Sequence, residues 1–144
     1  METGSGTAIL WPTIALVGLI YVVWFYMYLL RFAHMKSAPP KPSDFASGAA
    51  AQRYFQSVEL PGNNLANLFE MPVLYFALVP LLLLTDLASP SQVTLAWGYA
   101  AVRAIHSYEH IIRKRIRKRF SWYVLSCALL LAMWIGFAVE LLLR

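Results

Sequence analysis

The sequence predicts an all-α integral membrane protein, with residues 1–144 forming one domain of four transmembrane helices. Hydrophobic residues make up 60% of the chain and charged residues only 13%, which is too apolar for an ordinary soluble domain of 144 residues. Four apolar segments each exceed the length of about 18 residues that a helix needs to cross a bilayer. These segments run over residues 7–30, 62–84, 93–112 and 122–143.

Taken in order, the segments have distinct features. The first does not resemble a cleavable signal peptide, because Glu2 replaces the usual basic start and the apolar run continues past any cleavage site. In the second, Pro72 and Pro80 are expected to bend the helix, which neighbouring groups in a membrane bundle can accommodate. Only the residues TDLASPSQ separate the second and third segments, so these two should be antiparallel neighbours. The fourth follows directly on a basic run.

The distribution of lysine and arginine predicts the orientation. Of the twelve in the chain, four lie between the first and second segments and six between the third and fourth, whereas the short loop around Asp86 has none. The positive-inside rule therefore places both basic loops in the cytoplasm and both termini on the opposite side. The six residues of the second loop are Arg113, Lys114, Arg115, Arg117, Lys118 and Arg119.

The first basic loop starts Pro-rich and then becomes Ala-rich. Ser43 or Asp44 is a suitable cap for a short helix over residues 45–58 that lies at the membrane interface. Phe45, Tyr54 and Phe55 are the expected membrane contacts of this helix.

Polar residues within the apolar segments are costly, and they are therefore candidates for function. Two sets share one helical face each. The second segment has Asn63, Asn67 and Glu70 at i, i+4 and i+7, and the third has Arg103, His106 and His110 at i, i+3 and i+7.

Glu70 and Arg103 should reach similar depth in the two antiparallel helices. Glu70 lies roughly 12 Å along its helix from Gly62, and Arg103 roughly 15 Å from Arg113, at the rise of about 1.5 Å per residue. A Glu70–Arg103 ion pair would neutralise both charges. Such a pair could serve helix packing alone. The additional asparagines and histidines instead indicate a polar strip, open to a basic mouth, that suits an anionic water-soluble ligand from the cytoplasm. The basic loop itself could equally serve to set the topology or to bind anionic lipid.

The stretch HSYEH has the spacing of an inverted zinc-protease motif. His106 and His110 could share a metal ion with Glu70, which remains an alternative. However, Glu109 would point away from the histidine face, and Arg103 disfavours a nearby cation. We therefore expect no metal. The single cysteine, Cys127, excludes a disulfide framework and is expected to fill the core.

Three stretches resemble the family of membrane-associated proteins in eicosanoid and glutathione metabolism (MAPEG). They are NLFEMP in the second segment, RAIHSYEH in the third, and RKRFSWYVLS where the fourth begins. The likeness covers roughly residues 62–137, and the order and helical context of the stretches make it more specific than each alone. The chain looks like a bacterial member, which implies the bacterial inner membrane and periplasmic termini.

The resemblance implies a homotrimer that holds glutathione, as co-substrate, between neighbouring subunits. Asn67 and Glu70 would then hold the γ-glutamyl end, and Arg103 would orient Glu70. Arg31 would meet a glutathione carboxylate. The remaining implied site residues are His106 and His110, which would line the site, and Arg119 and Ser121, which would be catalytic and lie near the sulfur.

The implied activity is that of a transferase or peroxidase for lipophilic electrophiles or hydroperoxides delivered by the bilayer, with a role in detoxification and none in nucleic-acid binding. The chain departs from many members at two positions, with Asn63 in place of an arginine and His110 in place of a tyrosine. A non-catalytic membrane module, used for assembly or lipid binding, is therefore the alternative.

Overall fold

The computed structural model describes residues 6–143, which form helices and connecting turns and contain no strand. The α-helices are α1 (Leu10–Ser37), α2 (Gly48–Phe55), α3 (Leu60–Glu70), α4 (Pro72–Leu84), α5 (Pro90–Tyr108) and α6 (Ile116–Leu142). Short 3-10 helices occupy η1 (Gly6–Ile9), η2 (Pro42–Phe45) and η3 (Gln56–Val58), and η4 (Glu109–Arg113) is a π-helical turn.

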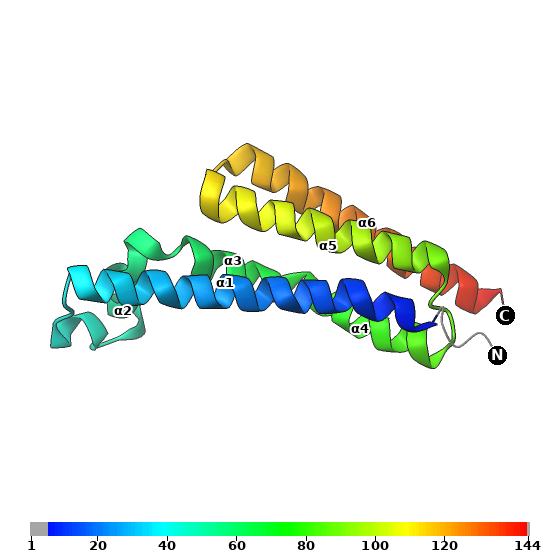
Figure 1. Ribbon diagram of the computed structural model, residues 1–144, viewed down its shortest axis with the longest axis horizontal. Coiled ribbons are helices and arrows are strands. Elements are labelled where there is room, and N and C mark those ends of the chain that lie inside the picture. The colour runs from blue at the N-terminus through cyan, green and yellow to red at the C-terminus, as the bar shows by residue number, and fades with distance from the viewer. Residues whose placement is uncertain (1–5, 144) are drawn as a thin grey trace.

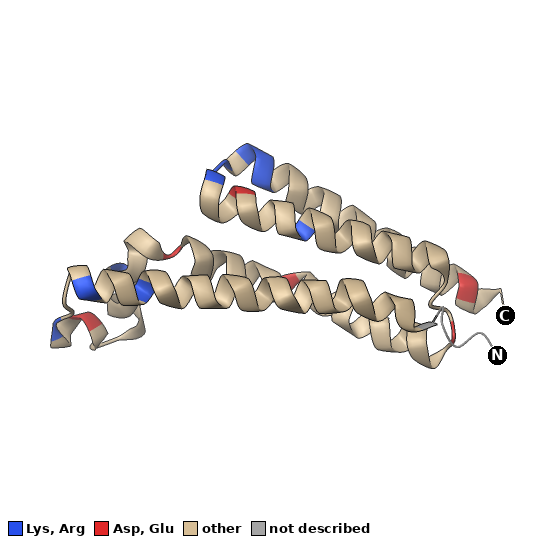
Figure 2. Ribbon diagram, viewed as in Figure 1, with Lys and Arg blue, Asp and Glu red and all other residues tan. Residues whose placement is uncertain are grey.

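The long helices form two layers. The first layer consists of α1 beside α3 and α4, and the second is a hairpin of α5 and α6 (Figure 1). Within this arrangement α5 packs chiefly on α6 and also contacts α1. Most of the basic residues lie towards the end of the molecule remote from the termini, on the α1–α3 and α5–α6 connections and the helix ends beside them (Figure 2). Both basic loops therefore lie at the same end of the bundle.

Three helical stretches are long and apolar enough to cross a membrane, namely Thr7–Ser37, Leu60–Leu84 and Ile116–Leu142. The remaining expected span, α5, is not among them, because polar residues such as Gln92 and Arg103 lower its hydropathy. These two side chains are buried within the protein. The chain is accordingly an integral membrane protein with three such helices among residues 6–143, and α5 lies against α1 and α6.

Several helix boundaries differ from the sequence-based expectation. Helix α5 runs over Pro90–Tyr108 rather than 93–112, and α6 begins at Ile116 rather than at residue 122. The first helix continues to Ser37 rather than ending at residue 30, and its last two turns carry Arg31 and Lys36. In the second segment the break falls at Pro72, which has no amide hydrogen to continue α3 and instead opens α4. Pro80 lies inside α4, which continues through it.

The predicted Ser43/Asp44 cap of the loop helix is wrong. Ser47 caps α2, and its Oγ accepts a hydrogen bond of 3.1 Å from the Ala50 amide. Asp44 instead accepts from the Lys41 amide at 2.8 Å and so closes η2. The reason is local: the Asp44 carboxylate already caps the short η2 helix that begins at Pro42, so a later residue has to cap α2.

The aromatic residues of this loop pack on one another. Phe45, Tyr54 and Phe55 have ring centroids 4.8–6.1 Å apart. The His34 ring of α1 lies 4.9 Å from that of Tyr54. This cluster ties α2 to the end of α1, and Phe45 keeps about half of its surface exposed for the predicted membrane contact.

The core near the termini joins all four long helical segments. The Tyr75 and Tyr99 rings stack at 5.1 Å, and the Tyr75 hydroxyl is 3.0 Å from the Thr13 hydroxyl of α1. The Gln92 side-chain amide donates to the Met133 carbonyl of α6 at 3.0 Å. These contacts hold the four segments together at the end of the bundle opposite the basic loops (Figure 2).

Candidate functional site

A cavity of about 540 Å³ lies between α3, α5, η4 and the start of α6. This volume is in the range typical of small-molecule sites. Its lining residues are Asn67, Glu70, His106, His110, Ile116, Arg117, Arg119, Phe120 and Tyr123. Five of the eight residues expected from the sequence therefore share one cavity within a single chain.

Asn67 links Arg103 to Glu70. The fully buried Arg103 donates from Nη2 to the Asn67 carbonyl at 2.9 Å and to its side-chain Oδ1 at 2.8 Å. The Asn67 Nδ2 donates in turn to Glu70 Oε2 at 2.9 Å. The expected Glu70–Arg103 ion pair is therefore wrong, and Arg31–Glu59 is the only salt bridge within residues 6–143. Asn67, three residues before Glu70, reaches the guanidinium first and leaves the carboxylate exposed.

The hydrogen bonds of Arg103 are incomplete. Its Nε and Nη1 are buried without a partner among the described residues. A buried guanidinium is stable only when opposite charge or further acceptors compensate it. The negative charge connected to Arg103 by hydrogen bonds is the Glu70 carboxylate, which the Asn67 side chain links to the guanidinium.

His106 connects α5 to the start of α6. Its Nδ1 lies 2.8 Å from the Arg119 carbonyl oxygen. Because a carbonyl can only accept, Nδ1 carries the proton in the neutral ring and Nε2 holds the free lone pair. Nε2 is buried and has no partner in the part of the chain that is described. His106 therefore lines the cavity and keeps one buried acceptor nitrogen without a partner among the described residues.

His110 contacts an asparagine that the sequence pattern did not single out. The Asn64 Nδ2 lies 3.3 Å from His110 Nδ1, and Asn64 is fully buried. Asn63, the residue expected from the sequence, is exposed. The signal was present, since Asn64 stands at i−3 from Asn67 and therefore shares its helical face.

Of the two expected catalytic residues, Arg119 lines the cavity and Ser121 does not. The Ser121 hydroxyl donates to the Arg117 carbonyl of its own helix at 3.2 Å. Tyr123, which was not expected from the sequence, occupies the place beside Arg119 instead. Helical spacing explains this, because Tyr123 is at i+4 from Arg119 and Ser121 is at i+2.

Arg31 lies outside the cavity in the single chain. Its Nη2 pairs with the Glu59 carboxylate at 3.1 Å, and its guanidinium carbon sits 5.0 Å from the centre of the Phe55 ring. Both charged side chains are about one-quarter exposed. The arginine thus fastens the end of α1 to the start of α3.

The three-ligand metal site of the alternative is not formed within one chain. In residues 6–143 no three His, Cys, Asp or Glu side chains come close enough together to hold a metal ion. His106 and His110 are perpendicular, with ring centroids 5.7 Å apart. Their Nδ1 atoms are engaged by Arg119 and Asn64.

Comparison with known proteins adds the family to this geometry. The profile of the MAPEG family matches residues 9–139, nearly the whole chain. No curated protein and no solved structure matches it. The match includes all eight expected site residues and every helix from α1 to the last turn of α6. The chain therefore belongs to the MAPEG family.

Proposed function

We propose that this protein is a glutathione-dependent membrane enzyme, a transferase or peroxidase for lipophilic electrophiles or hydroperoxides. One observation carries the proposal: the same cavity has the Glu70 carboxylate on one wall and the Arg119 guanidinium on another. Glutathione has an ammonium group, two carboxylates and a thiol, so it needs both signs of charge within one site. Family membership agrees with a membrane function related to glutathione or eicosanoids.

The residues of the cavity fit this ligand. Glu70 is oriented by Asn67 and its carboxylate is exposed, so it can accept hydrogen bonds from the ammonium group. Arg119 and Arg117 supply charge for a carboxylate or for the sulfur. His106 also lines the cavity, and its buried Nε2 has no partner among the described residues.

Arg119 is the proposed thiolate-stabilising residue. A cation beside the sulfur lowers the pKa of a thiol and so raises the fraction that is nucleophilic. In conjugation, the thiol loses its proton, sulfur bonds to the electrophilic carbon, and the leaving group departs with the electron pair. In peroxide reduction, two glutathione molecules form a disulfide while the hydroperoxide becomes an alcohol and water. Ser121, turned towards Arg117, has no direct part in one chain.

Titration of the purified protein with glutathione tests the proposal. We expect saturable binding by calorimetry, together with a rise in ultraviolet thiolate absorbance near neutral pH. Arg119→Gln should abolish the absorbance change but retain binding. Absence of binding at millimolar glutathione would refute the proposal.

A second candidate is a non-catalytic module of the same fold. Two observations favour it: Ser121 is turned away from the cavity, and Arg31 is already paired with Glu59. This candidate predicts that Arg119→Gln leaves cellular function unchanged and that no turnover occurs with any thiol. Turnover that depends on Arg119 excludes it.

We infer that the protein is a homotrimer, as the family resemblance implies. Glu70 is exposed within a stretch apolar enough to cross a membrane, so a second copy is needed to shield it from lipid. The mass of the protein in detergent, determined by light scattering with the detergent subtracted, tests this. A monomer would contradict it.

The proposed orientation puts both basic loops in the cytoplasm of a bacterial cell and both termini in the periplasm. The common position of the two loops at one end of the bundle supports it (Figure 2). A reporter enzyme that works only in the periplasm should be active when it is fused to either terminus. Activity of a reporter that works only in the cytoplasm, fused at the same positions, would show the opposite orientation.

A further inference from the structure

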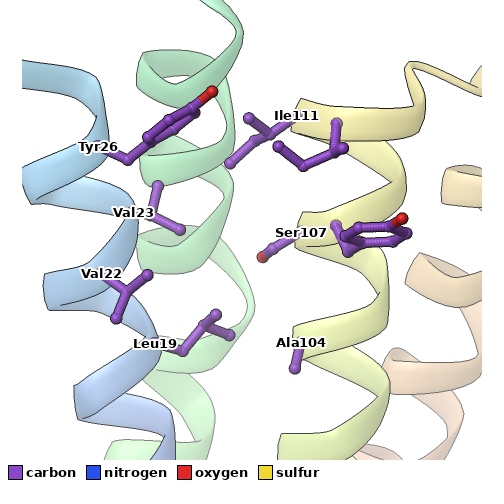
Figure 3. Close-up of a pocket in the computed structure, with 9 residues that line it drawn as sticks. Leu19, Val22, Val23, Tyr26, Ala104, Ser107 and Ile111 are labelled. Atoms are coloured by element: carbon purple, nitrogen blue, oxygen red, sulfur yellow. The ribbon is translucent and has the colours of Figure 1, made fainter. Parts of the chain in front are cut away.

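A second cavity, of about 290 Å³, lies between α1 and the end of α5 (Figure 3). It is lined by Leu19, Val22, Val23, Tyr26, Ala104, Ser107, Tyr108, Ile111 and Ile112. None of these residues lines the polar cavity. His106 and Ser107 are consecutive in α5, and each faces a different cavity. Helix α5 therefore separates two sites of opposite character.

The lining of this α1–α5 cavity is mostly apolar; Tyr26 and Tyr108 contribute partly exposed rings, and Ser107 contributes the one buried hydroxyl. Ser107 is 3% exposed, and its Oγ has no hydrogen-bond partner among residues 6–143. The hydroxyl points into the space between the two helices (Figure 3). Burying a hydroxyl without a partner costs free energy, which a carbonyl oxygen of a ligand would recover. The walls thus favour a hydrocarbon chain that carries an acceptor at one point.

A basic segment follows this cavity directly. Ile111 and Ile112 of η4 form part of its wall, and Arg113, Lys114 and Arg115 come next, all exposed. Ser107 precedes Arg113 by six residues, which is about 9 Å along a helix. Leu19 and Ala104 line the cavity on one side of the Ser107 hydroxyl, and Ile111 lies on the other side (Figure 3), followed in sequence by the basic segment. A glycerophospholipid likewise has its ester carbonyl between an acyl chain and an anionic phosphate.

We propose that the α1–α5 cavity binds one acyl chain of an anionic glycerophospholipid. The Ser107 hydroxyl donates to the ester carbonyl, and Arg113 and Arg115 attract the anionic headgroup. The cavity lies in a protein whose surroundings are acyl chains, so this lipid is present at high concentration. The site is separate from the proposed glutathione cavity, and it stands whether or not the protein is an enzyme.

Native mass spectrometry of the delipidated full-length protein tests the proposal. The protein is mixed in detergent with phosphatidylglycerol or with phosphatidylcholine of the same chain length. We expect one phosphatidylglycerol per chain, retained at roughly tenfold lower lipid concentration than phosphatidylcholine, as expected for a few basic residues near an anionic group.

Two substitutions on α5 form a matched pair. Ala104→Trp fills the cavity and should abolish the retained lipid, whereas Ala101→Trp, one helical turn earlier and outside the cavity lining, should retain it. Ser107→Ala removes the donor without adding bulk. It should weaken binding about fivefold, as expected for the loss of one hydrogen bond.

A second pair tests the charge. Arg113→Gln combined with Arg115→Gln should remove the preference for phosphatidylglycerol, while Arg53→Gln, on exposed α2, should keep it. If Ala104→Trp does not fold, Ser107→Ala and the arginine pair decide the question. Equal retention of both lipids overturns the proposal, as does undiminished retention in Ala104→Trp. So does a wild-type protein that holds no lipid because a second copy covers the cavity.

Discussion

Replacing Asn67 by alanine removes the side chain that connects Arg103 to Glu70. In the wild type, Arg103 Nη2 has two acceptors on Asn67, the carbonyl at 2.9 Å and Oδ1 at 2.8 Å. Asn67→Ala leaves only the first, while Nε and Nη1 are already without partners among the described residues. A hydrogen bond to a charged group contributes about 1.5–3 kcal/mol. We expect a loss of about 2 kcal/mol in the free energy of unfolding, because Arg103 is fully buried.

The matched control is Asn63→Ala, four residues earlier on the same helix and exposed. It should change the free energy of unfolding by no more than about 0.5 kcal/mol. Both variants can be compared by titration with sodium dodecyl sulfate in mixed micelles, with helical circular dichroism as the signal. In an Arg103→Met background, Asn67→Ala should cost at least about 1 kcal/mol less, which a double-mutant cycle measures. Equal stability of Asn67→Ala and Asn63→Ala would refute the proposed link.

Three further predictions concern other contacts. Arg119→Gln should lower kcat/KM for glutathione conjugation by about 100-fold, the scale for loss of one transition-state donor. Lys118→Gln, exposed and outside the cavity, should stay within about twofold, and equal effects would contradict the role of Arg119. Glu70→Gln should weaken glutathione binding by about tenfold, because a charge-assisted hydrogen bond becomes a neutral one. Calorimetry measures the affinity, and an unchanged value would show that the ammonium group of glutathione does not bind at Glu70. Glu59→Gln should lower the free energy of unfolding by about 1 kcal/mol at most, because its partner Arg31 is partly exposed. Thermal unfolding followed by circular dichroism measures this, and a larger loss would contradict a partly exposed ion pair.

Much of the architecture could be predicted from the sequence because its signals are local. Long apolar segments predict membrane helices without reference to any partner, and three of the four meet that criterion in the structure. The third segment is less apolar because it carries the buried Arg103 and His106. The N-terminal cap of α2 was harder to predict from the sequence, since Ser47 and Asp44 are both suitable cap residues. Only the turn at Pro42 determines which of them opens the helix.

The sequence by itself determined the helical segments, the basic end and the two polar faces on which Asn67 and His106 lie. Only the tertiary structure decided which atoms of those faces meet. Asn67 comes between Arg103 and Glu70 because the rotation and depth of two helices, set by packing across the whole bundle, bring its side chain closest to the guanidinium. The same packing presents Tyr123 to the cavity. Spacing along one helix fixes a face, whereas contact also requires the register of its neighbours.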